Sequence, residues 1–371
     1  MIKNNEVYLT FSDVQIVPMY SEIESRDDVS LETQLTKNYR LETPFVASPM
    51  PDVCETKMAI AMWELGGVGI IHRFMTIDEQ VNMVKHMWVY TNAWHSENPI
   101  ELHFANPVIA AAIGVTGDYF NRARALVDAG HANVLMLDVA HGHHRNVKLA
   151  MHKLLSLKGE FQFDIIAGTI ATPEAAGALI DWGADALRVG VGGGSACETR
   201  IRTGVGIPQL QAILNIHTSD IVNARSVPYA NIPILSDGGI RYPGDVAKAL
   251  IAGASTTMMG HLFAGTDESP GIELITGQFP DTKIKRVYKG AASASQKLNY
   301  NGAANYIEGA TKIIDARGPV SNVFGGLEDG LRSSLSYVGA ATISGFKAKG
   351  KLIQITQAGM VEAHPHMLFQ Q

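Results

Sequence analysis

Apolar and polar positions follow two alternating patterns along this chain. Stretches with an apolar residue at every third or fourth position end in glycine, and each is followed by a short, continuous apolar run. The first pattern predicts an amphipathic helix, and the second predicts a strand that is buried on both faces. Four copies of this helix–strand unit occur, at residues 58–72, 123–138, 174–190 and 245–260.

Four further apolar runs, at residues 45–48, 109–115, 163–169 and 232–236, bring the predicted strands to eight. Eight such units form a closed barrel, whereas an open doubly wound sheet favours a glycine-rich turn after its first strand. Here the glycine-rich loop follows the sixth strand instead. We therefore predict an α/β fold, a (β/α)₈ TIM barrel, with residues 1–371 forming a single domain.

Two segments interrupt the repeat. Residues 87–106 connect the second predicted helix to the third strand, and residues 264–322 follow the eighth strand. A long segment without a clear period inside a compact domain is usually a functional lid or a disordered piece. We predict a lid over about 264–322, followed by a C-terminal extension in which helix and strand periodicity returns at residues 327–343 and 352–356.

Composition narrows the class of protein. The two cysteines, Cys54 and Cys197, cannot build a disulfide framework, which indicates a reducing compartment. No stretch approaches 18 apolar residues, and the first residues do not resemble a signal peptide. The net charge of -6, without a cluster of Lys and Arg, disfavours nucleic-acid binding. We expect a cytoplasmic protein with neither a membrane nor a nucleic acid as partner.

The loop before Cys197 is the first candidate for chemistry. Glycine fills four of the five positions from Gly190 to Gly194. Such backbone has little steric barrier to positive φ and lets a ligand approach the main chain closely. A single thiol on this loop is better placed for nucleophilic attack than for packing, although a small apolar residue in a turn is the alternative. Cys54, at the start of a helix, is expected to be a buried structural thiol.

Other candidate residues fall at the ends of predicted strands. In a barrel, the C-terminal strand ends carry the site, and phosphate commonly binds after strands seven and eight. These two strands end near Asp237, Gly239 and Gly260, where glycine leaves backbone N–H groups able to face a phosphate. Strand four delivers Asp138 to the same rim and strand six delivers Cys197. Together they indicate covalent chemistry on a phosphorylated small molecule.

Several blocks, in the correct order, resemble the IMP dehydrogenase/GMP reductase family over nearly the whole chain. The matching blocks are residues 9–18, 69–72, 138–142, 188–209, 236–245, 264–271, 337–340 and 362–366. The resemblance is to the form without CBS regulatory domains, because only about twenty residues, 87–106, stand where that module is usually inserted.

The resemblance implies that Cys197 attacks C2 of a purine 5′-monophosphate and forms a covalent thioimidate. It implies that the substrate contacts Ser48, Met50, Ser195, Asp237, Gly239, Gly260, Tyr288 and Gly290. The nicotinamide cofactor, NADPH or NAD, would lie near Asp138 and Thr169. Backbone carbonyls of Gly192, Gly194 and Cys197 could bind K⁺, with Glu362 of a neighbouring subunit assisting, in a homotetramer.

The resemblance leaves the direction of the reaction open. Dehydrogenases of the family use an Arg–Tyr pair on the lid to hydrolyse the thioimidate, and residues 290–308 contain no Arg. Reductases use a Thr–Glu pair, which Thr199 and Glu308 could supply. The amino-acid sequences of several blocks are nevertheless closer to those of the dehydrogenases. We favour GMP reductase, with IMP dehydrogenase and a non-catalytic purine-nucleotide-binding protein as alternatives.

Overall fold

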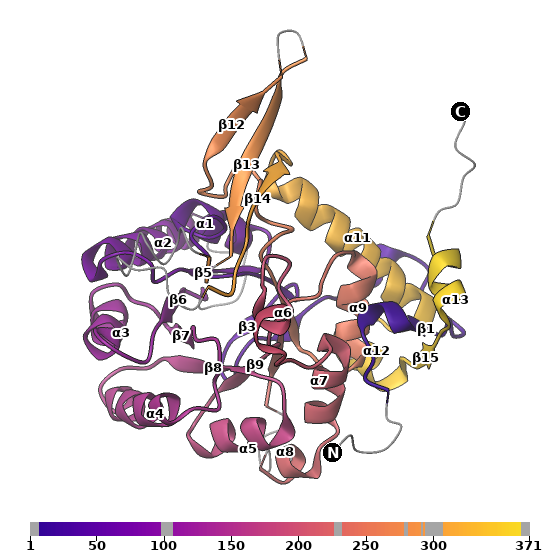
Figure 1. Ribbon diagram of the computed structural model, residues 1–371, viewed down its shortest axis with the longest axis horizontal. Helices are drawn as coiled ribbons and strands as arrows, with labels where there is room; N and C mark the ends of the chain where they lie inside the picture. The colour runs from indigo at the N-terminus through magenta and orange to yellow at the C-terminus, as the bar shows by residue number, and fades with distance from the viewer. Residues whose placement is uncertain are drawn as a thin grey trace.

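The predicted barrel is present. A computed structural model describes residues 7–97, 107–225, 232–277, 281–290, 292–293 and 307–364. Eight parallel strands close in the order β10-β11-β4-β5-β6-β7-β8-β9 (Figure 1). They are β4 (Phe45–Ala47), β5 (Val68–Ile71), β6 (Ala110–Ile113), β7 (Val134–Leu137), β8 (Asp164–Ile170), β9 (Ala186–Val189), β10 (Ile234–Asp237) and β11 (Thr256–Met259). Each overlaps one predicted apolar run.

Helices surround the strands (Figure 1). They are α1 (Thr56–Glu64), α2 (Ile77–Glu97), α3 (Tyr119–Asp128), α4 (Arg145–Lys158), α5 (Pro173–Asp181), α6 (Thr199–Thr203), α7 (Gln209–His217), α8 (Asp220–Arg225), α9 (Pro243–Ile251) and α11 (Val320–Val338). The strands are buried on both sides: in β7, Val134 and Met136 belong to the core inside the barrel, whereas Leu135 and Leu137 pack with the helices. This double burial explains why the strands are continuous apolar runs.

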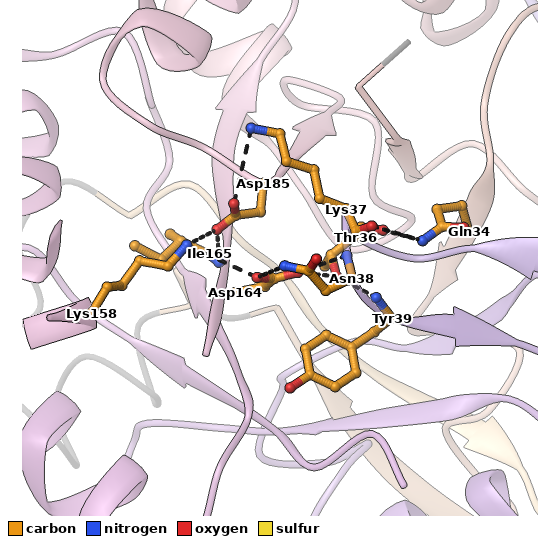
Figure 2. Close-up of polar contacts among 9 residues, drawn as sticks. All are labelled: Gln34, Thr36, Lys37, Asn38, Tyr39, Lys158, Asp164, Ile165 and Asp185. Atoms are coloured by element: carbon orange, nitrogen blue, oxygen red, sulfur yellow. Dashed lines mark hydrogen bonds and ion pairs between the residues drawn. The ribbon is translucent and has the colours of Figure 1, made fainter. Parts of the chain in front are cut away.

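A short hairpin closes the N-terminal end of the barrel. It consists of β2 (Thr33–Gln34) and β3 (Arg40–Leu41), which are antiparallel. Thr36 Oγ1 and Asn38 Nδ2 donate to the Asp164 carboxylate at 2.7 and 2.8 Å, and Lys158 Nζ lies 3.9 Å from Asp164 and 2.5 Å from Asp185 (Figure 2). The hairpin is thus tied by charged hydrogen bonds to the start of β8.

The predicted connection at residues 87–106 is wrong in its first half. Helix α2 continues to Glu97, and its buried residues Gln80, Val84, Met87 and Thr91 recur at helical spacing. Because Gln80 and Thr91 on the buried face are polar, this face of the helix does not appear as an apolar repeat in the sequence. Residues 98–106 lie outside the described part of the chain.

The segment predicted as a lid contains a regular sheet. Strands β12 (Glu273–Thr276), β13 (Lys283–Lys289) and β14 (Thr311–Asp315) pair antiparallel and project away from the barrel (Figure 1). The segment ends earlier than predicted, because α11 begins at Val320. Residues 278–280, 291 and 294–306 lie outside the described ranges. We call residues 264–319 the flap.

The C-terminal extension returns to the start of the chain. It comprises α12 (Ile343–Lys349), β15 (Leu352–Gln354) and α13 (Gln357–Glu362), and β15 pairs antiparallel with β1 (Val14–Ile16). Two short 3₁₀ helices, Phe11–Asp13 and Arg26–Asp28, complete the described elements. Within those elements, none of the helices combines the length and apolar character needed to cross a bilayer.

Candidate active site

A cavity of about 530 Å³ opens at the C-terminal ends of the barrel strands. Its lining includes every residue predicted for catalysis, substrate binding or cofactor binding, together with both glycines of the predicted cation site. These are Ser48, Met50, Asp138, Thr169, Gly192, Gly194, Ser195, Cys197, Thr199, Asp237, Gly239, Gly260, Tyr288, Gly290 and Glu308. Glu362 is the exception, since it ends the exposed helix α13 and is not part of this lining.

Cys197 stands at one end of a short line of polar groups. Its thiol is exposed, and Sγ lies 3.2 Å from Thr199 Oγ1. Thr199 Oγ1 in turn donates to Glu308 Oε2 at 2.6 Å. Cys54 is buried, and burial raises the pKa of its thiol, so it is not a second nucleophile. The pair predicted from sequence, Thr199 and Glu308, therefore meets directly beside the candidate nucleophile.

Main-chain hydrogen bonds hold the flap against the cysteine loop. The Glu198 N–H donates to the Glu308 carbonyl at 2.8 Å, and the Ala310 N–H donates to the Ala196 carbonyl at 2.9 Å. These two bonds flank Cys197, so Glu308 cannot move away without releasing the loop. The Glu198 carboxylate is occupied separately, by Arg202 at 2.7 Å on the same short helix.

Four predicted substrate residues from three elements surround one point in the cavity. A Cβ added to Gly260 would lie 2.9 Å from Ser48 Oγ, 3.0 Å from the Tyr288 hydroxyl and 3.1 Å from Met50 Sδ. Burial raises the pKa of Tyr288 to about 12 against the opposing effect of its hydrogen bond with Ser195, so its hydroxyl stays a neutral donor. Among the described residues, the buried Ser48 Oγ has no partner. Such a group is available to a ligand.

The turn after β10 is shaped by two glycines. Gly238 and Gly239 have φ of +94° and +80°, a conformation that other residues rarely adopt. The Gly239 N–H donates to the Gly193 carbonyl at 3.0 Å. This bond joins the turn to the cysteine loop. The expectation of a Gly239 N–H free to face a phosphate is therefore not met, although Gly239 lines the cavity.

Four charged groups line the cavity in a row. Arg188 Nε lies 2.8 Å from Asp237 Oδ2, and Arg188 Nη1 lies 2.9 Å from Asp138 Oδ1. Arg73 Nε approaches the other oxygen of Asp138 at 3.3 Å. Burial alone would raise the pKa of Asp138, but Arg188 and Arg73 outweigh it and hold that pKa below its ordinary value. Asp138 is thus fixed as a carboxylate.

Sequence reasoning missed both arginines. Arg188 is the single charged residue in an otherwise apolar strand, β9, and that position was a usable signal. Arg73 and Phe74 follow β5 at the same rim, and the Arg73 guanidinium carbon lies 4.8 Å from the Phe74 ring centroid. The rule that functional residues follow strand ends, applied to this strand, would have found them.

The predicted cofactor and cation residues are partly engaged by the protein itself. Thr169 Oγ1 donates to the Val139 carbonyl at 2.9 Å. The Gly194 carbonyl accepts the Cys197 N–H at 3.0 Å. Among the described residues, no group of three or more His, Cys, Asp and Glu side chains could hold a metal ion. A cation at this loop would depend on main-chain carbonyls instead.

Comparison with known proteins identifies the family. The family model "IMP dehydrogenase / GMP reductase domain" matches residues 8–366. The chain is 36% identical to the inosine-5′-monophosphate dehydrogenase of Borreliella burgdorferi, covering 97% of both chains, and 37% identical to that of Cryptosporidium parvum, covering 98% of this chain and 96% of the relative. It is 29% identical to the GMP reductase of Leishmania major, covering 96% of each.

A solved structure matches over the same length. The crystal structure of GMP reductase from Trypanosoma brucei in complex with guanosine 5′-monophosphate superposes with a TM-score of 0.85 at 30% identity, covering 98% of this chain and 99% of that one. Both dehydrogenases and reductases are thus among the relatives. The chain belongs to the IMP dehydrogenase/GMP reductase family and is an oxidoreductase of that type.

Proposed function

We propose that the protein is a GMP reductase, which converts GMP, NADPH and two protons into IMP, ammonium and NADP⁺. The observation that carries the proposal is the Thr199 hydroxyl, 3.2 Å from Cys197 Sγ and 2.6 Å from Glu308 Oε2. A further support is the absence of Arg from residues 290–308, where a dehydrogenase of the family would carry its base.

The chain's own groups account for the chemistry at C2. The sulfur of Cys197 bonds to C2 of guanine as the exocyclic nitrogen leaves, and the Thr199 hydroxyl passes a proton between Glu308 and that nitrogen. The nitrogen departs as ammonia. A nicotinamide cofactor, when bound, supplies the hydride that reduces C2. Cys197 then leaves as the thiolate and IMP is released.

Substrate recognition would rest on the polar groups that line the cavity. The unpartnered Ser48 Oγ and the neutral Tyr288 hydroxyl, with Ser195 beside it, are suited to donate to phosphate oxygens. The Asp237 carboxylate is suited to accept from ribose hydroxyls. Met50, Gly260 and Gly290 leave room for the nucleotide near these groups.

The cofactor would occupy the part of the cavity that Asp138 and Thr169 line. This part also carries the flat Phe74 ring and the Arg73 guanidinium. An aromatic face, a guanidinium and a fixed carboxylate together fit a planar nicotinamide and its ribose hydroxyls. The donor set therefore suits NADPH or NAD.

We include the cation and the assembly in the proposal. K⁺ would bind the carbonyls of Gly192, Gly194 and Cys197, with Glu362 from a neighbouring subunit in a cytoplasmic homotetramer. Glu362 lies in an exposed helix away from its own cavity, so it would serve a second subunit.

The second candidate is IMP dehydrogenase, which converts IMP, NAD⁺ and water into XMP, NADH and a proton. One observation favours it: the chain is 36–37% identical to two dehydrogenases but 29% identical to the Leishmania reductase. Both reactions use the same thioimidate, so Cys197 has the same role in either. They differ in what cleaves it, water or hydride.

The test offers GMP with NADPH and, separately, IMP with NAD⁺, while the absorbance of reduced nicotinamide is followed. A reductase consumes NADPH and releases ammonia only in the first mixture. A rise in absorbance with XMP release in the second mixture alone would contradict the proposal and establish the dehydrogenase. Activity in neither mixture, with GMP binding retained, would establish the non-catalytic binder. Cys197→Ala serves as the inactive control.

A further inference from the structure

We propose that Arg188 is a positioning residue that couples nucleotide binding to cofactor binding, because it ties Asp237 to Asp138 so that ordering one carboxylate orders the other. The inference rests on the proposed function only in that a purine nucleotide and a nicotinamide cofactor share the cavity. It holds for either direction of the reaction.

One guanidinium bridges the two halves of the site. Nε of Arg188 serves Asp237, which ends β10, and Nη1 serves Asp138, which follows β7. The planar fork presents these donors in fixed directions, so the two carboxylates are oriented relative to each other as well as to the arginine. A single ammonium group offers no such fork.

The barrel leaves the space that this bridge needs. Arg188 lies on β9, so its side chain must pass β8 to reach the end of β7. Its register partner on β8 is Gly168, where a Cβ would lie 2.7 Å from the Arg188 Cβ. The glycine therefore keeps the path over β8 open.

Burial strengthens the bridge, so that the two carboxylates move together, and places it where the two ligands would meet. The Arg188 side chain is 12% exposed, and those of Asp138 and Asp237 are 13% and 21% exposed. Charged hydrogen bonds with so little access to water are directional and weakly screened. Each carboxylate still lines the cavity.

The coupling follows from ordering. A nucleotide that binds Asp237 restricts that carboxylate, and through Arg188 it restricts Asp138 before the cofactor arrives. Less conformational freedom of the site is then lost when the cofactor binds. Each ligand therefore raises the affinity for the other by the same factor.

The experiment measures binding in a Cys197→Ala background, where turnover is blocked. Calorimetry gives the affinity for NADPH without and with saturating GMP, and the same series is run with NAD⁺ and IMP. We expect saturating nucleotide to raise the affinity for the cofactor by at least about fivefold. The ratio is the cofactor affinity with nucleotide divided by that without it. With Arg188→Gln the ratio falls to about one, and Arg188→Lys gives the same loss because one ammonium cannot hold both carboxylates.

Arg73→Gln is the matched control. Arg73 binds the same Asp138 from its other side and, among the described residues, forms no ion pair with Asp237. This variant weakens cofactor binding but keeps the ratio. A structural role common to any buried arginine would not separate the two variants.

The outcomes distinguish this inference from the proposed function. If neither ligand pair binds the parent protein, the proposed function fails. If both ligands bind and the parent ratio is one, or if a folded Arg188→Gln keeps the parent ratio, the coupling role is overturned. Asp138→Asn, which leaves Arg188 in place, also loses the ratio and provides the test should both Arg188 variants fail to fold.

Discussion

The two ends of the barrel carry the same interaction to different effect. At the C-terminal end, Arg188 lies between Asp138 and Asp237, and at the N-terminal end Lys158 lies between Asp164 and Asp185. The first group lines an open cavity. The second is covered by the β2–β3 hairpin (Figure 2). A shared cation stabilises the closed end, whereas at the open end it leaves carboxylates oriented toward a ligand.

The two ends also shift carboxyl pKa values in opposite directions. Two arginines hold the pKa of Asp138 low despite its burial. At the other end, burial and the neighbouring Asp164 charge raise the pKa of Asp185 more than Lys158 lowers it. Lys158, which is shared with Asp164, and Lys37, 4.0 Å from Asp185, do not compensate the burial of the Asp185 carboxylate.

The largest expected effect is at the open end. Cys197→Ala removes the nucleophile and should reduce turnover by about 10³-fold or more. Because the side chain is exposed, the free energy of unfolding should change by no more than about 0.5 kcal/mol. Steady-state assays and chemical denaturation measure both quantities. Turnover retained in this variant would show that the active site does not lie at this end of the barrel.

Glu308→Gln should lower turnover by about 10²-fold, since the proton relay through Thr199 is lost while the hydrogen-bonding shape is kept. Thr199→Val should give a similar loss, and the double variant should be little worse than either single one. Additive losses in the double variant would show that the two residues do not act as a unit. Nucleotide affinity, measured by calorimetry, should persist in all three.

The closed end should respond in stability instead of activity. Asp164→Ala leaves Thr36, Asn38 and Lys158 without their shared acceptor and should lower the free energy of unfolding by about 3 kcal/mol. Turnover of the folded variant should be unchanged. Asp181→Ala, which breaks an exposed pair with Arg225, is the matched control and should cost at most about 1 kcal/mol. Equal losses would contradict the distinction.

The smallest effect concerns pH. The low pKa of Asp138 contributes stability above its ordinary value of 3.8, and that contribution is lost as pH falls through the folded-state pKa. The raised pKa of Asp185 acts in the opposite sense, because its contribution is present at low pH and is lost as pH rises through the folded-state pKa. In urea unfolding, Asp138→Asn should reduce the fall in the free energy of unfolding at acid pH. Asp185→Asn should reduce the loss of that free energy as pH rises toward neutral.

The barrel could be predicted because its strands are buried on both faces and so read as unbroken apolar runs. The sheet within the flap could not, since its strands are half exposed and Lys289 pairs with the distant Thr311. Five site residues were found where glycine turns or polar residues end a strand: Asp138, Cys197, Asp237, Gly239 and Gly260. The other candidates came from the family resemblance. The role of Arg188 was not found, because its reach depends on which residue faces it across β8, and that register appears only in the folded barrel.

The central claim is that Cys197 bonds to a purine ring. Incubation with IMP and NAD⁺ or NADP⁺, an acid quench and mass spectrometry of the intact chain and its peptides test it most directly. The account predicts one IMP, less two hydrogens, attached to the peptide that contains Cys197 and absent from Cys197→Ala. A protein that turns over its substrate while this peptide never gains mass, or gains it elsewhere, would contradict the account.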